Sequence, residues 1–219
     1  LGNSPDPIKL MEQFGADGVR LGMLLCSSAG NDILFDESQV EQGRNFCNKI
    51  WNAYRLIRGW EVSADIQQSE HSKLAAEWFD NKLSQTIETI DEHFSKFRLS
   101  DALMTLYKFF WDDFCAWYLE VIKPEYGKPI DKVTYDTAIV FFEKLLRLLH
   151  PIMPFITEEL WQNIEERKDG ETIMLQPQPK AAPYSVETIH AFEQGVGAIA
   201  SVRNIRQSKG ISPKEALTL

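Results

Sequence analysis

Hydrophobic residues recur at intervals of three and four along most of the chain, which is the period of a helix that buries one side. The pattern is clearest from 37 to 58, where the apolar or small positions are Val40, Gly43, Cys47, Ile50, Tyr54 and Ile57. Similar spacing predicts long helices at 72–97, 101–123 and 131–150, and a shorter helix that starts at Pro154. The pattern therefore predicts an all-α fold, an antiparallel helix bundle.

Capping and breaking residues indicate where several helices begin and end. Asp6, which precedes a proline, and Gly15 are expected to begin and end a first short helix. Asp17 is expected to cap a second short helix. Asp36, followed three residues later by a glutamine, predicts the cap of the helix at 37–58.

The same pattern divides the chain into three regions. Residues 1–36 are expected to form short helical pieces, and residues 37–170 are expected to form the bundle. Residues 171–219 begin with prolines at 177, 179 and 183, which predict an extended connection, and continue with a helix at about 185–208.

The distribution of charge separates the helix at 37–58 from the rest of the chain. The protein has 23 basic and 32 acidic residues, a net charge of −9. No acidic residue occurs from 42 to 60, and the four cations in this stretch are Arg44, Lys49, Arg55 and Arg58. Removing these four leaves 19 basic against 32 acidic residues. A basic helix on an otherwise acidic protein is one signature of a nucleic-acid-binding surface.

Polar side chains share the side of this helix opposite its apolar stripe, because they follow spacings of three and four. They are Arg44, Asn45, Asn48, Lys49, Asn52 and Arg55. Basic side chains neutralise phosphates, and asparagine amides can bond to base edges. Leu56 adds an aliphatic surface on which an unstacked base could rest. The alternative at this point is an ordinary solvated helix face without an RNA role.

Motifs for catalysis or metal binding are missing from the sequence. There is no glycine-rich phosphate loop and no nucleophile elbow. Asp112 and Asp113 are adjacent, so on a helix they point about 100° apart and are expected to form a solvated face. Glu187 and His190 form one Glu-x-x-His pair, whereas a di-metal centre in a bundle needs two. We therefore expect no catalytic residue, no metal site and no cofactor in this chain.

Hydropathy and cysteine content indicate the cellular setting. No apolar run approaches the roughly 18 residues that a membrane span needs, and no signal peptide is recognisable. The three cysteines are far apart and odd in number, which fits reduced thiols better than a disulfide framework. The sequence thus predicts a cytoplasmic protein with no membrane partner.

Several segments resemble the class I aminoacyl-tRNA synthetases. Leu1-Gly2-Asn3 is similar to the end of their Lys-Met-Ser-Lys-Ser-Leu-Gly-Asn signature. Residues 43–53 (GRNFCNKIWNA) and 114–120 (FCAWYLE) resemble the valyl-tRNA synthetases specifically. Residues 149–161 (LHPIMPFITEELW) resemble a segment shared by the valyl, isoleucyl and leucyl enzymes. The resemblance covers nearly the whole chain.

This resemblance implies a division of labour within a longer synthetase. Residues 1–36 would be a stem-contact segment, residues 37–170 the anticodon-binding bundle, and residues 171–219 a connection towards a further C-terminal region. The chain would begin just after the signature loop, so ATP, Mg²⁺ and valine would bind a catalytic domain of the parent ligase that is absent here. The partner expected for this chain itself is valine tRNA.

The resemblance also implies particular tRNA contacts, at Lys49, Arg55, Leu119 and Glu120. Together with the other side chains of the polar helix face, the predicted tRNA-binding residues are Arg44, Asn48, Lys49, Asn52, Arg55, Leu56, Leu119 and Glu120. Leu56 stands where some relatives have an aromatic residue. Two alternatives stay open, namely the same module from an isoleucyl or leucyl enzyme, and a protein-interacting helical bundle without an RNA role.

Overall fold

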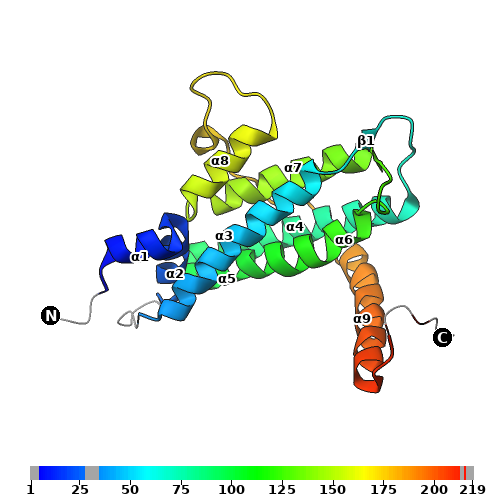
Figure 1. Ribbon diagram of the computed structural model, residues 1–219, viewed down its shortest axis with the longest axis horizontal. Coiled ribbons are helices and arrows are strands. Elements are labelled where there is room, and N and C mark those ends of the chain that lie inside the picture. The colour runs from blue at the N-terminus through cyan, green and yellow to red at the C-terminus, as the bar shows by residue number, and fades with distance from the viewer. Residues whose placement is uncertain (1–4, 28–34, 213–214, 216–219) are drawn as a thin grey trace.

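The computed structural model describes residues 5–27, 35–212 and 215. Leu1–Asn3, which resemble the end of the synthetase signature, and residues 28–34 lie outside this part of the chain. Helices dominate the structure, and the predicted all-α bundle is confirmed (Figure 1). The elements in chain order are α1 (Pro7–Phe14), α2 (Ala16–Leu25), α3 (Glu37–Arg58), β1 (Val62–Ser63), α4 (Glu70–Ser95), α5 (Leu99–Lys108), η1 (Phe109–Tyr118), α6 (Leu119–Ile122), β2 (Ile130–Asp131), α7 (Lys132–Leu149), α8 (Pro154–Ile164), η2 (Ile173–Leu175) and α9 (Val186–Lys209).

The bundle consists of α3, α4, α7 and the continuous rod formed by α5, η1 and α6. Helices α1 and α2 lie at one end of it, α8 packs along its side against α7, and α9 projects from the other end, near α6 (Figure 1). At that second end, β1 and β2 form a two-stranded parallel pair in which Val62 lies opposite Ile130. This pair ties the chain after α3 to the chain before α7.

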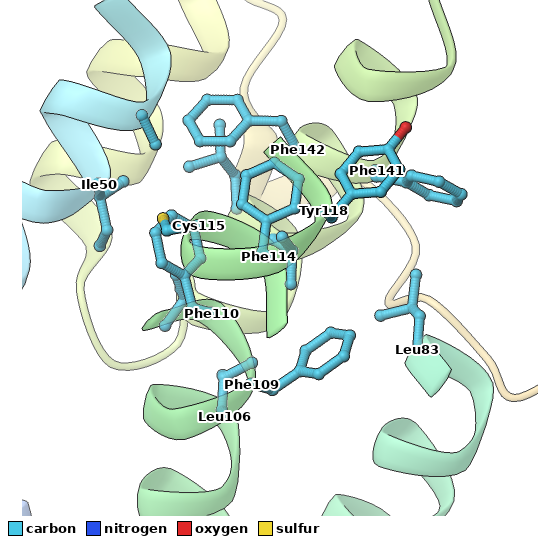
Figure 2. Close-up of a cluster of buried hydrophobic side chains, with 14 of the residues drawn as sticks. Ile50, Leu83, Leu106, Phe109, Phe110, Phe114, Cys115, Tyr118, Phe141 and Phe142 are labelled. Carbon is cyan, nitrogen blue, oxygen red and sulfur yellow. The ribbon is translucent and has the colours of Figure 1, made fainter. Parts of the chain in front are cut away.

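Aromatic residues fill the centre of the bundle. Phe114 of η1 lies between Phe110 and Phe142, with ring centroids 5.5 and 6.1 Å away (Figure 2). Phe79 of α4 contacts the same cluster through Tyr118, at 4.8 Å. Each of these side chains is fully buried. Burying one large apolar side chain contributes roughly 1.5–3 kcal/mol, so this cluster is a main source of the bundle's stability.

Helix caps agree with the sequence at most positions. The carboxylates of Asp6 and Asp36 accept hydrogen bonds from the backbone N–H groups of Ile8 and Ser38, as expected of N-caps. Gly15 follows α1 with a φ of +77°, a conformation that suits glycine. Both predicted ends of α1 are therefore confirmed.

The prediction that Asp17 caps α2 is wrong. Gly15 occupies the N-cap position of α2, and Asp17 lies buried in the first turn of that helix. Its carboxylate accepts hydrogen bonds from the N–H groups of Phe155 and Ile156, at 3.3 and 2.7 Å. Burial raises the pKa of Asp17, although these two hydrogen bonds oppose the shift. Asp17 thus provides the hydrogen-bond acceptor for backbone N–H groups at the N-terminus of α8, a helix more than 130 residues away in the sequence.

The long rod predicted at 101–123 exists, but its middle part, η1, is a π-helix. A π-helix pairs each N–H with the carbonyl five residues back, so its turns are wider than those of an α-helix. The buried side therefore shifts along the sequence, to Tyr118, Leu119 and Ile122. Trp117 is only half-buried as a consequence.

Candidate nucleic-acid interface

The exposed face of α3 carries most of the predicted contact residues. Phe46, Ile50 and Ile57 face the core, which turns the opposite side of the helix to solvent. The exposed side chains on that side are Arg44, Asn45, Asn48, Asn52 and Arg55. At 1.5 Å per residue, the face from Arg44 to Arg55 is about 16 Å long. It is thus long enough to follow several nucleotides.

The four cations of α3 have no acidic partner among the described residues. Within the described part of the chain, Arg44, Lys49, Arg55 and Arg58 form no salt bridge. Elsewhere, cations are paired with carboxylates at Lys73, Lys82, Lys96, Lys123, Lys128, Lys132, Lys144 and Arg167. The positive charge of α3 is therefore available to an external anion such as a phosphate.

Two of these cations contact aromatic side chains at the flanks of the face. The Nζ atom of Lys49 lies 5.0 Å from the ring centroid of Trp111 on η1. Arg58 approaches the hydroxyl of Tyr135 on α7, with a donor–acceptor distance of 3.4 Å. Lys49 and Arg58 thus lie on opposite sides of the strip formed by Arg44, Asn48 and Arg55.

A cleft of about 610 Å³ lies where α3 ends. Its volume falls in the range of small-ligand pockets. One wall comes from the end of α3 and includes Leu56 and Trp60, and the other comes from the turn after α6 and includes Lys123, Pro124 and Tyr126. Leu56 is half-buried, as expected for a residue that lines the cleft, whereas Tyr126 is fully exposed.

Glu120 and Leu119, the two sites predicted on the rod, have different environments. Glu120 is exposed, and its carboxylate lies 2.6 Å from Nζ of Lys123, a residue that lines the cleft. Leu119 is only 1% exposed and belongs to the hydrophobic core. The shift caused by the π-helix places it there, so its predicted role as an RNA contact is corrected to a packing role.

A second cleft, of about 430 Å³, lies at the other end of the exposed face. Arg44 and Asn48 line it together with residues of α1 and α2 and with Phe155 of α8. Phe155 is an exposed aromatic residue, 65% accessible. The structure thus places six of the eight predicted residues on α3, which runs between two clefts about 18 Å apart. Glu120 lies near the first cleft through its salt bridge to Lys123.

The sequence reasoning missed Trp60, Lys123, Tyr126 and Lys128, which line the first cleft. The only local signal was the turn itself, because Pro124, Gly127 and Pro129 surround an aromatic residue. Leu56 and Tyr126 are 70 positions apart in the sequence, so their proximity depends on the packing of the bundle.

The described residues give little support for a metal site, a membrane span or a reactive thiol. No group of three or more potential metal ligands occurs in them, and none of their helices has the length and apolarity to span a membrane. Burial raises the pKa of the Cys47 and Cys115 thiols to about 12, so these thiols are protonated at neutral pH. Nδ1 of His150 lies 2.8 Å from the hydroxyl of Thr157, a structural contact at the start of α8.

Comparison with known proteins identifies the family. A family model described as the anticodon-binding domain of tRNA ligase matches residues 76–219. The chain belongs to this family. The chain is 56% identical to the valine–tRNA ligase of Porphyromonas gingivalis and 55% identical to that of Phocaeicola vulgatus, in both cases over its whole length. The valine–tRNA ligase of Fusobacterium nucleatum is 40% identical over 97% of the chain.

The chain spans about a quarter of the length of these relatives. Its fold is similar to part of LeuRS in the crystal structure of the ternary complex of Agrobacterium radiobacter K84 agnB2 LeuRS-tRNA-LeuAMS. That similarity has a TM-score of 0.55 and a sequence identity of 20%, and it covers 86% of this chain and 22% of the LeuRS chain. The resemblance to valyl-tRNA synthetases seen in the sequence is therefore confirmed, together with the helical-bundle fold.

Proposed function

We propose that this chain recognises the anticodon arm of valine tRNA and positions that tRNA for a valine–tRNA ligase. The observation that carries the proposal is the face of α3, on which cations without acidic partners alternate with exposed asparagines. The names of the relatives favour valine over isoleucine or leucine. The family match favours an RNA partner over a purely protein-interacting bundle.

The proposed contacts follow from the chemistry of each side chain. Arg44 and Arg55 neutralise phosphates, and Asn48 and Asn52 bond to base edges. An unstacked base of the loop rests against Leu56 in the cleft at the end of α3.

The margin of this cleft supplies further groups for the same base. Tyr126 offers a stacking surface there. Glu120, exposed beside the cleft, supplies an acceptor for an amino group of a base.

The chemical step belongs to other parts of the proposed ligase. ATP, Mg²⁺ and valine bind outside this chain, and the chain contributes binding energy and orientation. A cytoplasmic location suits the three free thiols at Cys26, Cys47 and Cys115. The face of α3 is thus a recognition surface for a reaction that takes place elsewhere.

A titration tests the proposal. The chain is mixed with valine tRNA and with the same tRNA carrying a changed anticodon, and affinity is measured over a series of salt concentrations. We expect tighter binding to the native anticodon. We also expect that Arg55→Ala weakens binding and reduces the salt slope by about one, because one phosphate contact is lost.

Lys132→Ala is the matched control for this substitution. Lys132 is an exposed cation on α7 that pairs with Asp136 at 2.6 Å, so its loss should leave tRNA affinity unchanged. Equal affinity for both tRNAs would rule out anticodon reading. An unchanged salt slope in Arg55→Ala would remove Arg55 from the interface.

A further inference from the structure

Lys49 has an unusual environment among the cations of this protein. It is half-buried on the flank of α3, and no salt bridge or side-chain hydrogen bond joins it to another described residue. Its side chain contacts the indole of Trp111, whose centroid lies 5.0 Å from Nζ. A long flexible side chain without an ionic partner depends on such a contact for its orientation.

Trp111 is itself held by two further rings. Its ring plane is inclined by 21° to that of Tyr107 and by 19° to that of Phe46, with centroid separations of 5.6 and 6.4 Å. Phe46 is fully buried in the core and belongs to α3, as Lys49 does, whereas Tyr107 belongs to α5. The indole is thus clamped against the bundle on one side and is free to accept a cation on another.

Asp112 follows Trp111 in the chain, but no salt bridge joins Lys49 to a carboxylate among the described residues. Trp111 lies in η1, and the Cys115 thiol, one turn further along, is close enough to Lys49 to interact with it electrostatically. The Cys115 thiol is protonated at neutral pH, because burial raises its pKa to about 12. Trp111 therefore holds the ammonium group at a defined place without neutralising it.

We propose that Trp111 is a positioning residue that holds Lys49 in the orientation in which it binds a backbone phosphate of RNA. The inference rests on the proposed function, and it adds a residue that acts through Lys49. Restricting the Lys49 side chain before binding lowers the entropy lost when it contacts a phosphate. A cation–π contact at a partly exposed site strengthens the bound orientation by roughly two- to fivefold.

A double-mutant cycle tests this coupling. The affinity of valine tRNA is measured for the wild type, Lys49→Ala, Trp111→Leu and the double variant. We expect Trp111→Leu to weaken binding roughly two- to fivefold in the wild-type background. The same change in the Lys49→Ala background should have no further effect, since Trp111 then has no cation to hold. Trp111→Phe keeps a ring and should retain part of the affinity.

One control variant and one direct measurement separate positioning from a general loss of structure. Trp117→Leu removes the other half-buried tryptophan of η1, which lies under Arg203 of α9 at 5.3 Å, and it should leave tRNA affinity unchanged. The free protein offers a direct readout by NMR. The ε-methylene protons of Lys49 should be shifted upfield by the Trp111 ring current, and the shift should disappear in Trp111→Leu.

The possible failures of the two proposals can be distinguished. If the wild type does not prefer the native anticodon, the proposed function fails, while the NMR readout still tests the contact between Lys49 and Trp111. If the wild type binds as expected but Lys49→Ala has no effect, the positioning role is overturned and the interface rests on Arg55. A further loss of affinity from Trp111→Leu in the Lys49→Ala background, or an equal loss in Trp117→Leu, would also overturn it.

Discussion

Asp112 and Asp113 are neighbours on η1, yet their environments differ. Asp112 is exposed, and Asp113 is half-buried. Burial raises the pKa of Asp113 to about 6; Lys82 opposes this shift, and Asp112 and Glu193 add to it. The prediction of a solvated face is correct for Asp112 and wrong for Asp113. For single residues, burial therefore decides what a side chain does: it sets the pKa of Asp113, and it gives Leu119 a packing role.

The raised pKa of Asp113 predicts a pH-dependent stability. The folded protein binds a proton more tightly than the unfolded chain, whose Asp pKa is about 3.9, so the free energy of unfolding falls as pH rises from about 4 to about 6. Asp113→Asn should remove this part of the decline. At pH 7 it should raise the free energy of unfolding by about 1 kcal/mol, less than the full shift implies because solvent screens the half-buried group.

Urea unfolding at several pH values measures this effect. Asp112→Asn, a change at the exposed neighbour, serves as the comparison and should reduce the decline only slightly, because burial contributes more to the raised pKa of Asp113 than the charge of Asp112 does. Parallel pH profiles for Asp113→Asn and the wild type would contradict the assignment.

At the scale of elements, α2 and α3 cross with their backbones almost in contact. A Cβ atom added at Gly22 would lie 2.5 Å from Cα of Val40, and one added at Gly43 would lie 2.3 Å from the carbonyl oxygen of Gly18. Such distances are far below van der Waals contact, so any side chain at these positions would push the helices apart. Because Arg44 follows Gly43, this crossing also sets the geometry of the cleft that Arg44 and Asn48 line.

The crossing predicts opposite effects of the same substitution at different glycines. Gly22→Ala and Gly43→Ala should each destabilise the protein by about 1–3 kcal/mol, the usual result of overpacking. Gly195→Ala on α9 meets nothing within 4 Å and should instead stabilise by up to about 1 kcal/mol through helix propensity. Thermal unfolding of the three variants measures both effects. A melting temperature for Gly22→Ala and Gly43→Ala equal to that of the wild type would show that the crossing can relax at little cost.

At the scale of the whole molecule, the first helices are joined to the bundle by several long-range contacts. Leu21 of α2 is part of the main hydrophobic core. Arg20 donates hydrogen bonds to the carbonyl oxygens of Pro151 and Ile152, at 3.1 and 2.8 Å. Helix α9 is attached chiefly through its first half, where Phe192 stacks on Trp78 with centroids 4.2 Å apart. The domain boundary at residue 36 stays a prediction, and these contacts indicate that α2 folds together with α3.

Hydrogen exchange tests this cooperativity. Amides of α2 and α3 should open with similar free energies, because the two helices share one core. Amides of α9 beyond Gly195 should exchange sooner, since the side chains of this part of the helix are largely exposed. If α2 exchanged well before α3, residues up to 36 would be a separate folding unit, as the sequence pattern suggested.

Local patterns in the sequence determined much of this protein. Helix positions follow from the spacing of apolar residues, and helix ends follow from caps such as Asp6 and Asp36, because both depend on residues within one or two turns. The cationic face of α3 was visible for the same reason. Neighbours on a helix face are three or four residues apart, so Arg44, Asn48 and Arg55 could be placed together without a tertiary structure.

Tertiary structure alone decided the features that join distant parts of the chain. Asp17 caps α8 because α2 packs against that helix, and the π-helix in η1 turns Leu119 inward. The cleft between Leu56 and Tyr126 exists because the bundle brings the ends of α3 and α6 together. The contact between Trp111 and Lys49 also depends on packing, because the rings of Phe46 on α3 and Tyr107 on α5 hold Trp111 in place. These contacts depend on packing between elements, and the residue spacing along one helix carries no information about them.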